Sequence, residues 1–242
     1  CPMPLSTLTI FASRPQPDRS LPPLDDPTAR TLLAAAHAQL YKWPPTFTGY
    51  QARLLVNDNG IRYAGSVSVR LGHGTHIHLD GDEALATWVR ECLWTQAWHL
   101  ADIPFAEGIG RYGITFVSTQ EEGKSSPRGR QLLLRDGPQP TRYWVRDGRY
   151  WQIERQEPNG ARRVDIIERY DMAPDGRRYT THSVTTHFSA PKGARTAVES
   201  YVNEFIWSGD VLFPCRRTVT DVVTDALRTR EITLSGHIRI AE

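Results

Sequence analysis

The stretch DEALATWVRECLWTQAWHL, residues 82–100, decides the fold because it is the one long helical pattern among short alternating segments after residue 50. At 100° per residue, one broad face carries its apolar side chains, which are Leu85, Trp88, Val89, Cys92 and Leu93. Trp94 and Trp98 stand four residues apart on the opposite side. A helix that lies on one sheet needs only one apolar face, so these two rings need a second contact. We expect them to be buried against the first helix of the chain; the alternative is a groove where something binds.

That first helix is predicted to begin at Asp26-Pro27, where an N-cap residue precedes a proline in the first helical position. Apolar residues then recur at helical spacing through Leu33 and Leu40. The helix must end by Trp43, because Pro44 and the proline after it force the preceding residue out of the helical region.

The rest of the chain alternates apolar and polar residues in short segments, separated by turn sequences such as Asn57-Asp58-Asn59-Gly60 and Asp147-Gly148. Consecutive hairpin turns predict an antiparallel meander, and strands of this length in one sheet must curl. We therefore predict an α+β fold that is mostly antiparallel β, a strongly curved sheet (half-barrel) with the helix at 82–100 on its concave face and one N-terminal helix. The predicted strands are 50–56, 61–69, 75–79, 112–119, 130–135, 141–147, 149–156, 162–172, 177–188, 197–208, 211–224 and 227–240.

The sequence begins at Cys1, which is the residue that a bacterial lipoprotein carries, diacylated, at its mature N-terminus. Seven prolines follow within residues 2–27, and such a density gives a semi-rigid spacer. We expect residues 1–27 to be a tether with a lipid anchor at Cys1, and residues 28–242 to be a single curved-sheet domain. The alternative is that the sequence happens to start at a cysteine.

The overall charge and hydropathy exclude two classes of function. The formal net charge is only +2 and no basic run of five residues occurs, so no nucleic-acid partner is expected. No apolar segment of 18 residues occurs either, so nothing in the sequence is predicted to span a membrane.

Histidines and cysteines offer weak candidates for chemistry. His73, His76 and His78 form the run HGTHIH, in which the last two project to one side of a strand, but nearby carboxylates are too few for a metal site. Cys92 and Cys215 are expected to be buried, inert thiols, with a disulfide as the alternative. Nucleophile, phosphate-loop and dinucleotide motifs are missing from the sequence, so we expect a protein that is not an enzyme and has no cofactor.

Aromatic residues are the stronger signal. Besides the three helix tryptophans, aromatic residues gather around the Asp147-Gly148 turn. Core packing explains most such rings, whereas an exposed pair would indicate a surface for a partner. The candidates for a ligand groove or an interface are Trp88, Trp94, Trp98, Tyr143, Trp144 and Trp151.

The chain resembles domain of unknown function 3386, a family of oxygenic phototrophs, over about residues 28–240. The residues that carry the resemblance are Ala35-Ala36, Tyr41, Trp43, Phe47, Gly49-Tyr50, Leu93-Trp94, His99 and Pro104-Phe105, with weaker matches at Tyr143, Val145, Asp147, Phe213-Pro214 and Arg216. The HGTHIH run is not part of this pattern. The resemblance implies a cyanobacterial or plastid setting, and the order of elements is similar to that of half-barrel lipoprotein carriers.

Three functional hypotheses follow. The first is a membrane-tethered accessory or assembly subunit of a photosynthetic membrane protein complex, held through a lipidated Cys1 and facing the periplasm or the thylakoid lumen. The second is a carrier or sensor of a lipid, pigment or other apolar ligand, which predicts a continuous apolar groove between the helix and the sheet. The third is a metal protein that uses the histidines.

Overall fold

The computed structural model describes residues 25–117, 127, 129–135, 140–190, 193–223 and 226–241, so Cys1 and most of the predicted tether lie outside the described residues. The helices are α1 (Pro27–Ala38), α2 (Glu83–Leu100) and the short 3-10 helix η1 (Ile109–Arg111). The strands are β1 (Gly49–Asp58), β2 (Ile61–Arg70), β3 (Gly74–Leu79), β4 (Gly113–Phe116), β5 (Arg130–Arg135), β6 (Pro140–Arg146), β7 (Arg149–Gln156), β8 (Arg162–Met172), β9 (Arg178–Phe188), β10 (Arg195–Ser208), β11 (Val211–Val223) and β12 (Ala226–Arg239).

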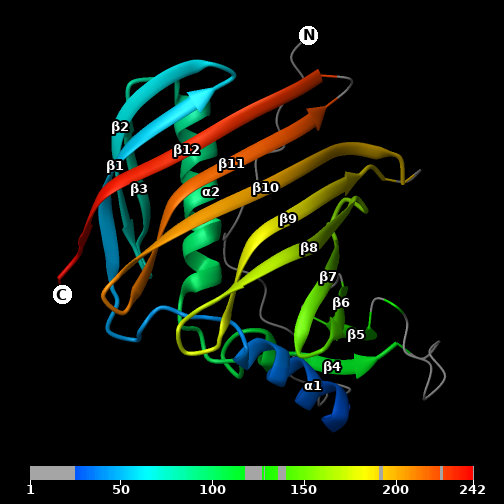
Figure 1. The fold of residues 1–242 in the computed structure, drawn as a ribbon. Coiled ribbons are helices and arrows are strands. Elements are labelled where there is room, and N and C mark those ends of the chain that lie inside the picture. Colours follow the sequence, from blue (N-terminus) through cyan, green and yellow to red (C-terminus); the bar gives the residue numbers. More distant parts are fainter. Residues whose placement is uncertain are drawn as a thin grey trace.

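The described strands form one antiparallel sheet in the order β3-β2-β1-β12-β11-β10-β9-β8-β7-β6-β5-β4. Every neighbour in the run from β4 to β12 is joined by a sequential connection, and β12 then pairs with β1. The sheet curves around α2, and α1 lies at its lower edge (Figure 1). The predicted fold class, a curved, mostly antiparallel sheet with α2 on its concave face, is confirmed.

Local sequence sets both helix starts. The Asp26 carboxylate accepts hydrogen bonds from the amides of Thr28 and Ala29, at 2.8 and 3.0 Å, as a proline-led N-cap requires. At α2, Asp82 accepts from the amide of Leu85 at 2.7 Å. Both predicted helix starts are thus confirmed.

Two hydrophobic cores hold the concave side together. In the first, the apolar stripe of α2 packs on β1–β3 and β12; its fully buried members include Val56, Val69, Val89, Leu93 and Ile232. In the second, α1 packs on β4, β6 and β7. The segment between α1 and β1 contributes to the first core, where the buried Trp43 ring donates its Nε1–H to the carbonyl of Leu212 at 2.7 Å.

Candidate functional site

The flank of α2 next to its core stripe faces the inner side of β10–β12. Nε2 of Gln96 lies 3.4 Å from Oδ1 of Asn203 on β10, and the guanidinium of Arg230 on β12 lies 3.9 Å from the centre of the Trp88 ring. These two contacts show which side of each strand faces the helix.

The pairing register of the strands then identifies which residues of the other strands face the same inner side, because paired residues share a face and alternate residues of a strand do so too. Asn203 pairs with Arg217, Glu199 with both Asp221 and Thr185, and Thr185 with Asp165. The inner side of β7–β12 therefore carries a group of polar side chains that we call the inner polar row: Arg155, Arg163, Asp165, Thr185, His187, Glu199, Tyr201, Asn203, Arg217, Asp221 and Arg230.

Asp165 is the most heavily bonded carboxylate of the row. It contacts Arg163 at 2.9 Å and Arg155 at 3.1 Å, and it accepts the Thr185 hydroxyl at 2.7 Å. Burial alone raises the pKa of this carboxyl, but the two guanidinium groups and the hydroxyl outweigh it, so the net pKa is lowered. Asp165 is thus a charged, pre-positioned centre of the row.

Two further acids of the row, Glu199 and Asp221, also bind neighbouring side chains. Glu199 binds Nε2 of His187 at 3.0 Å and accepts the Tyr201 hydroxyl at 2.8 Å. Burial raises the pKa of Glu199, yet these two hydrogen bonds lower it more. Asp221 pairs with Arg230 at 2.9 Å. Each carboxylate of the row therefore has its own cationic or hydroxyl partner.

Arg217 has no such partner. Its guanidinium lies 4.6 Å from the centre of the Tyr201 ring, and none of the ion pairs among the described residues includes it. Its Nε–H is buried without a hydrogen-bond acceptor in the described part of the chain. The row thus contains one cation whose charge is not balanced by a neighbouring carboxylate.

His99 lies at the end of α2 that approaches this row. The side chain of His99 is exposed to solvent. The ring is therefore desolvated by the atoms that crowd around it and not by complete burial. Desolvation first, then the charges of Lys42, Arg155 and Arg217, lower the pKa of His99. The Lys42 ammonium also donates to the backbone carbonyl of His99 at 2.8 Å. The imidazole is therefore neutral at neutral pH.

The apolar groove that was expected between helix and sheet is not found among the described residues. Over β1–β3 and β12, side chains of α2 and the sheet fill the space as one core. Over β7–β11, the inner side is the charged row described above. An apolar ligand therefore has no continuous apolar surface on this side of the described sheet.

The six aromatic candidates do not form one cluster. Trp88 is half-buried over Arg230, whereas Tyr143 is buried in the second core beside Tyr150. Trp144 is half-buried, and so is Trp151, which lies 4.4 Å from the Arg146 guanidinium.

The expected burial of both outer helix tryptophans is wrong for Trp98, which is 45% exposed, while Trp94 is half-buried. The physical reason is the position of α1, which packs on β4, β6 and β7 and so is not placed to cover the outer side of α2.

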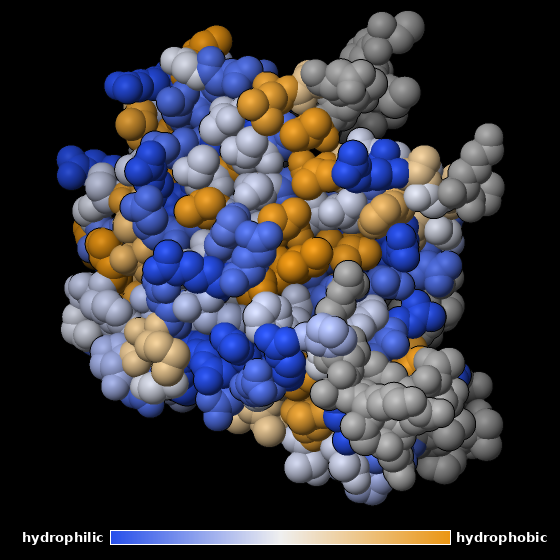
Figure 2. Space-filling view, turned by 45° about the vertical axis from the view of Figure 1, so that its right-hand side comes forward, coloured by the Kyte–Doolittle hydropathy of each residue, from blue (hydrophilic) through white to orange (hydrophobic). Residues whose placement is uncertain are grey.

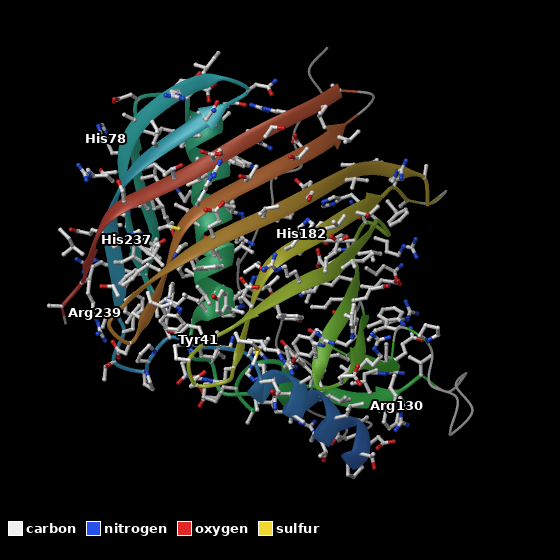
Figure 3. The ribbon with its side chains drawn as sticks, in the orientation of Figure 1. Tyr41, His78, Arg130, His182, His237 and Arg239 are labelled. Carbon is white, nitrogen blue, oxygen red and sulfur yellow. The ribbon has the colours of Figure 1, made fainter. Side chains whose placement is uncertain are left out.

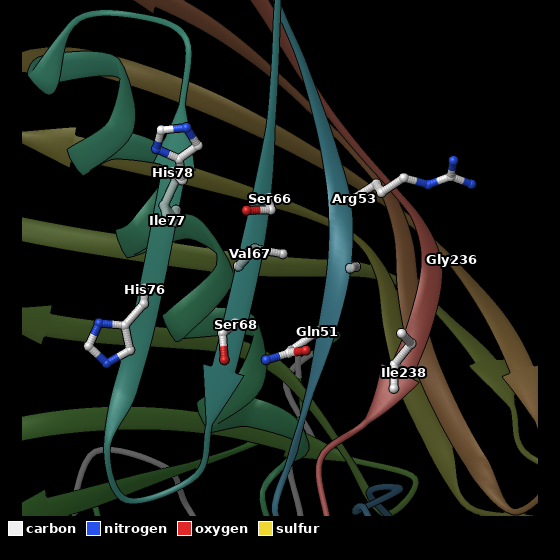
Figure 4. A pocket seen from close by; sticks show the side chains of 11 residues that line it. Gln51, Arg53, Ser66, Val67, Ser68, His76, Ile77, His78, Gly236 and Ile238 are labelled. Carbon is white, nitrogen blue, oxygen red and sulfur yellow. The ribbon is translucent and has the colours of Figure 1, made fainter.

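The HGTHIH histidines lie on the opposite side of the sheet. His76 and His78 project from the outer face of β3, opposite Ser68 and Ser66 of β2, and border an open hollow of about 460 Å³ (Figure 4). His73 is in the turn before β3. Within the described ranges, no group of three His, Cys, Asp or Glu residues has metal-binding geometry.

The other predicted histidine and cysteine positions can also be located. His182 is on the outer face of β9, with Nε2 3.1 Å from the Ser200 hydroxyl (Figure 3), whereas His187 is in the inner row, so the two histidines of this strand point to opposite sides of the sheet. Cys92 and Cys215 are free thiols, and no disulfide joins them. Cys92 is buried as expected, but Cys215 is only half-buried, because it is the extra residue of a β-bulge in β11.

Comparison with known proteins completes the description. A family model described as "Protein of unknown function (DUF3386)" matches residues 24–239. No curated protein matches the chain. Among the described residues, no helix combines the length and the apolarity needed to cross a membrane.

Two solved structures are among those to which the chain is distantly similar. A putative outer membrane lipoprotein-sorting protein domain from Vibrio parahaemolyticus has a TM-score of 0.38 and 8% identity, covering 88% of this chain and 92% of that one. A chain of the Pseudomonas aeruginosa MucA/MucB complex has a TM-score of 0.24 and 10% identity, covering 89% of this chain and 100% of that one. At these TM-scores the two structures give no information about what this chain binds.

Proposed function

Because the chain belongs to the DUF3386 family of proteins of unknown function, whose model matches residues 24–239, we propose from its geometry that it is a non-enzymatic binding protein. The binding surface is the inner polar row together with the flank of α2 that faces it. The ligand or partner segment carries a polar, charged group and is not purely apolar.

One observation supports this proposal above all others: charged side chains are concentrated on the concave side of the sheet, where a structural core would place apolar ones. Arg155 and Arg163 keep 38% and 27% of their side-chain surface exposed although they point inward. Keeping charges partly desolvated costs free energy unless they are paired, so a purely structural role would favour apolar residues here. A charged group that enters this side would meet donors already held in place by Asp165.

The binding proposal is tested by a bulky substitution on each face of β9. Ser183 points to the inner side and Thr186 to the outer side. The full chain is purified from its native membranes, and small molecules released on denaturation are identified by mass spectrometry. Wild type and Thr186→Trp are expected to release the same compound, and Ser183→Trp to release little of it. Equal recovery from Ser183→Trp would place binding elsewhere, and no compound from any of the three would contradict a carrier role.

We also propose that the protein is tethered to a membrane through a lipidated Cys1, facing the periplasm or the thylakoid lumen. Support comes from the seven prolines within residues 2–27, a density typical of an extended spacer. The mass of the native peptide that contains Cys1 is expected to include the acyl chains. A Cys1→Ala variant should move to the soluble fraction; an unmodified native cysteine would refute the anchor.

A second candidate is the accessory subunit of a photosynthetic membrane complex. It is favoured by apolar side chains on the outer face of the sheet, where Val202, Val222 and Leu227 are exposed. Hydrophobic residues on that side form separate clusters among hydrophilic ones (Figure 2). Crosslinking in native membranes should then capture one membrane protein through outer-face positions. Crosslinks that form only through inner-face positions would favour the first candidate.

A further inference from the structure

Arg217 lies on β11, one strand from the β12 end of the inner polar row. It pairs in register with Asn203, whose side chain contacts Gln96 of α2, so the guanidinium faces the helix. The neighbouring Arg216 faces the outer side, where it pairs with Glu204 and Glu231. Two consecutive arginines thus have opposite faces and opposite electrostatic surroundings.

The surroundings of Arg217 lack a compensating negative charge. Asp165 is bound by two arginines, Glu199 by His187 and Tyr201, and Asp221 by Arg230. Each acid of the row is thus bonded to another side chain, and none of these bonds reaches Arg217 in the described part of the chain, although Oδ1 of Asp221 has no hydrogen-bond partner there. Lys42 and Arg155, which act on His99 together with Arg217, carry the same sign as Arg217.

Titratable groups on α2 do not supply the charge either. Burial raises the pKa of the Cys92 thiol to about 11, so it is not a thiolate at neutral pH. His99 has a lowered pKa and is neutral there. Glu91 is on the same helix, and burial raises the pKa of its carboxyl. Among the described residues no ion pair or hydrogen bond joins these groups to Arg217, whose guanidinium lies 4.6 Å from the centre of the Tyr201 ring of β10.

Polar groups beside Arg217 also lack partners. Gln96 is only 5% exposed, and its side-chain oxygen has no hydrogen-bond partner among the residues that the structure describes. The Nε–H of Arg217 is in the same condition. Buried polar atoms are normally satisfied. The Arg217 Nε–H is a donor and calls for an acceptor such as an oxygen of an anion, whereas the Gln96 oxygen is itself an acceptor and calls for a donor group of the ligand.

We propose that Arg217 is the anion-binding point of the inner face and takes one carboxylate or phosphate group of the ligand; this rests on the proposed binding function. The planar N–H fork of a guanidinium suits the two oxygens of such a group, and contact with the Tyr201 ring helps to hold the fork in place. Because Tyr201 is itself held by Glu199, the fork is positioned before the ligand arrives.

The test uses the full chain and four probes in calorimetric titrations: inorganic phosphate, acetate, laurate and methyl laurate. Laurate binding with no response to methyl laurate is expected if the source is a lipid acid, and binding of phosphate or acetate is expected if it is a free anion. Arg217→Met should weaken the bound probe about 10- to 100-fold, the usual effect of losing a hydrogen bond to a charged group. Arg216→Met, its neighbour on the outer face, should leave binding unchanged.

A conservative variant and a stability measurement guard against misfolding. Arg217→Lys keeps the charge but loses the planar fork, so it should fold normally and still weaken binding. The proposal is overturned if none of the probes binds, if laurate and methyl laurate bind equally, or if Arg217→Met binds like wild type at an unchanged melting temperature. If the Arg217 variants bind the probes like wild type, the role of Arg217 is refuted but the binding function is not. The binding function is tested separately by the amount of compound recovered from Ser183→Trp.

Discussion

At the scale of single residues, Asp165 shows how the inner row is held. Asp165→Asn removes the charge that two arginines and a hydroxyl share, and leaves both guanidinium groups with a weaker acceptor. We expect the free energy of unfolding at pH 7 to fall by about 1–3 kcal/mol, less than for a fully buried pair because both arginines are partly exposed. Urea denaturation measures this. Asp175→Asn, which breaks an exposed pair with Arg177, should cost less than about 1 kcal/mol.

The same carboxylate makes stability depend on pH. The pKa of Asp165 is lower in the folded chain than its ordinary value near 4, so its stabilisation is complete above that value and is lost as pH falls through the folded pKa. Glu199, also lowered, acts in the same direction. At pH values below about 4, the melting temperature of the wild type should therefore decrease as the pH falls. The melting temperature of Asp165→Asn should depend less on pH in that range. Parallel curves would mean that Asp165 has an ordinary pKa in the folded protein.

Sequence alone could not place Arg217. In the run Pro214-Cys215-Arg216-Arg217, either arginine could face inward, because side chains alternate along a strand. The bulge at Cys215 inserts one residue between the pairs Phe205–Pro214 and Glu204–Arg216. A one-residue shift moves every later side chain of the strand to the opposite face of the sheet. The site therefore depends on a bulge that neither turn residues nor periodicity predict.

At the scale of elements, turns were predictable because their residues are chemically restricted. Asn59 and Asp147 both adopt positive φ, at 51° and 53°, and each precedes a glycine in the same region, which is the requirement of a tight hairpin. Strand positions followed from these turns. The surroundings of the second face of α2 could not be predicted in this way. Periodicity identifies the two faces of the helix but does not show whether α1 or solvent contacts the second one.

The β2–β3 pair shows how closely these elements approach. Gly65 on β2 lies opposite Leu79, and a Cβ at this position would be 2.1 Å from the His78 carbonyl oxygen. Gly65→Ala must therefore push β3, and the part of α2 that packs on it, away from β2. We expect a loss of about 1–3 kcal/mol, typical of overpacking, with faster amide exchange in β3.

A neighbouring substitution provides the control for that prediction. Ser66 is exposed on the outer face of the same strand, so Ser66→Ala should change stability by less than about 0.5 kcal/mol. Equal effects of the two substitutions would show that β2 and β3 separate without cost.

At the scale of the whole molecule, the sheet is joined in its middle by its first and last strands, β1 and β12. The run from β4 to β12 is a meander, and β1–β3 form a second one; the pairing of β12 with β1 unites them. Hairpin signals predicted each meander but not this long-range pair, because its partners are more than 170 residues apart and share no local signal.

Removal of β12 tests whether that pairing unites the fold. A chain that stops at residue 225 loses β12, which pairs with residues 50–58 of β1, and with it two core side chains, Ile232 and Leu234, which are 1% and 4% exposed. Each buried aliphatic side chain contributes about 2–5 kcal/mol, and a whole domain has only about 5–15 kcal/mol of stability. We therefore expect no cooperative thermal transition for this chain. Among the described residues, a chain that stops at Arg239 loses the backbone hydrogen bonds of Ile240 with Thr48 and Gly49, and it should melt cooperatively a few degrees lower. Cooperative melting of the shorter chain near the full-length temperature would show that α2 and the N-terminal segment, and not the β1–β12 ladder, join the two meanders.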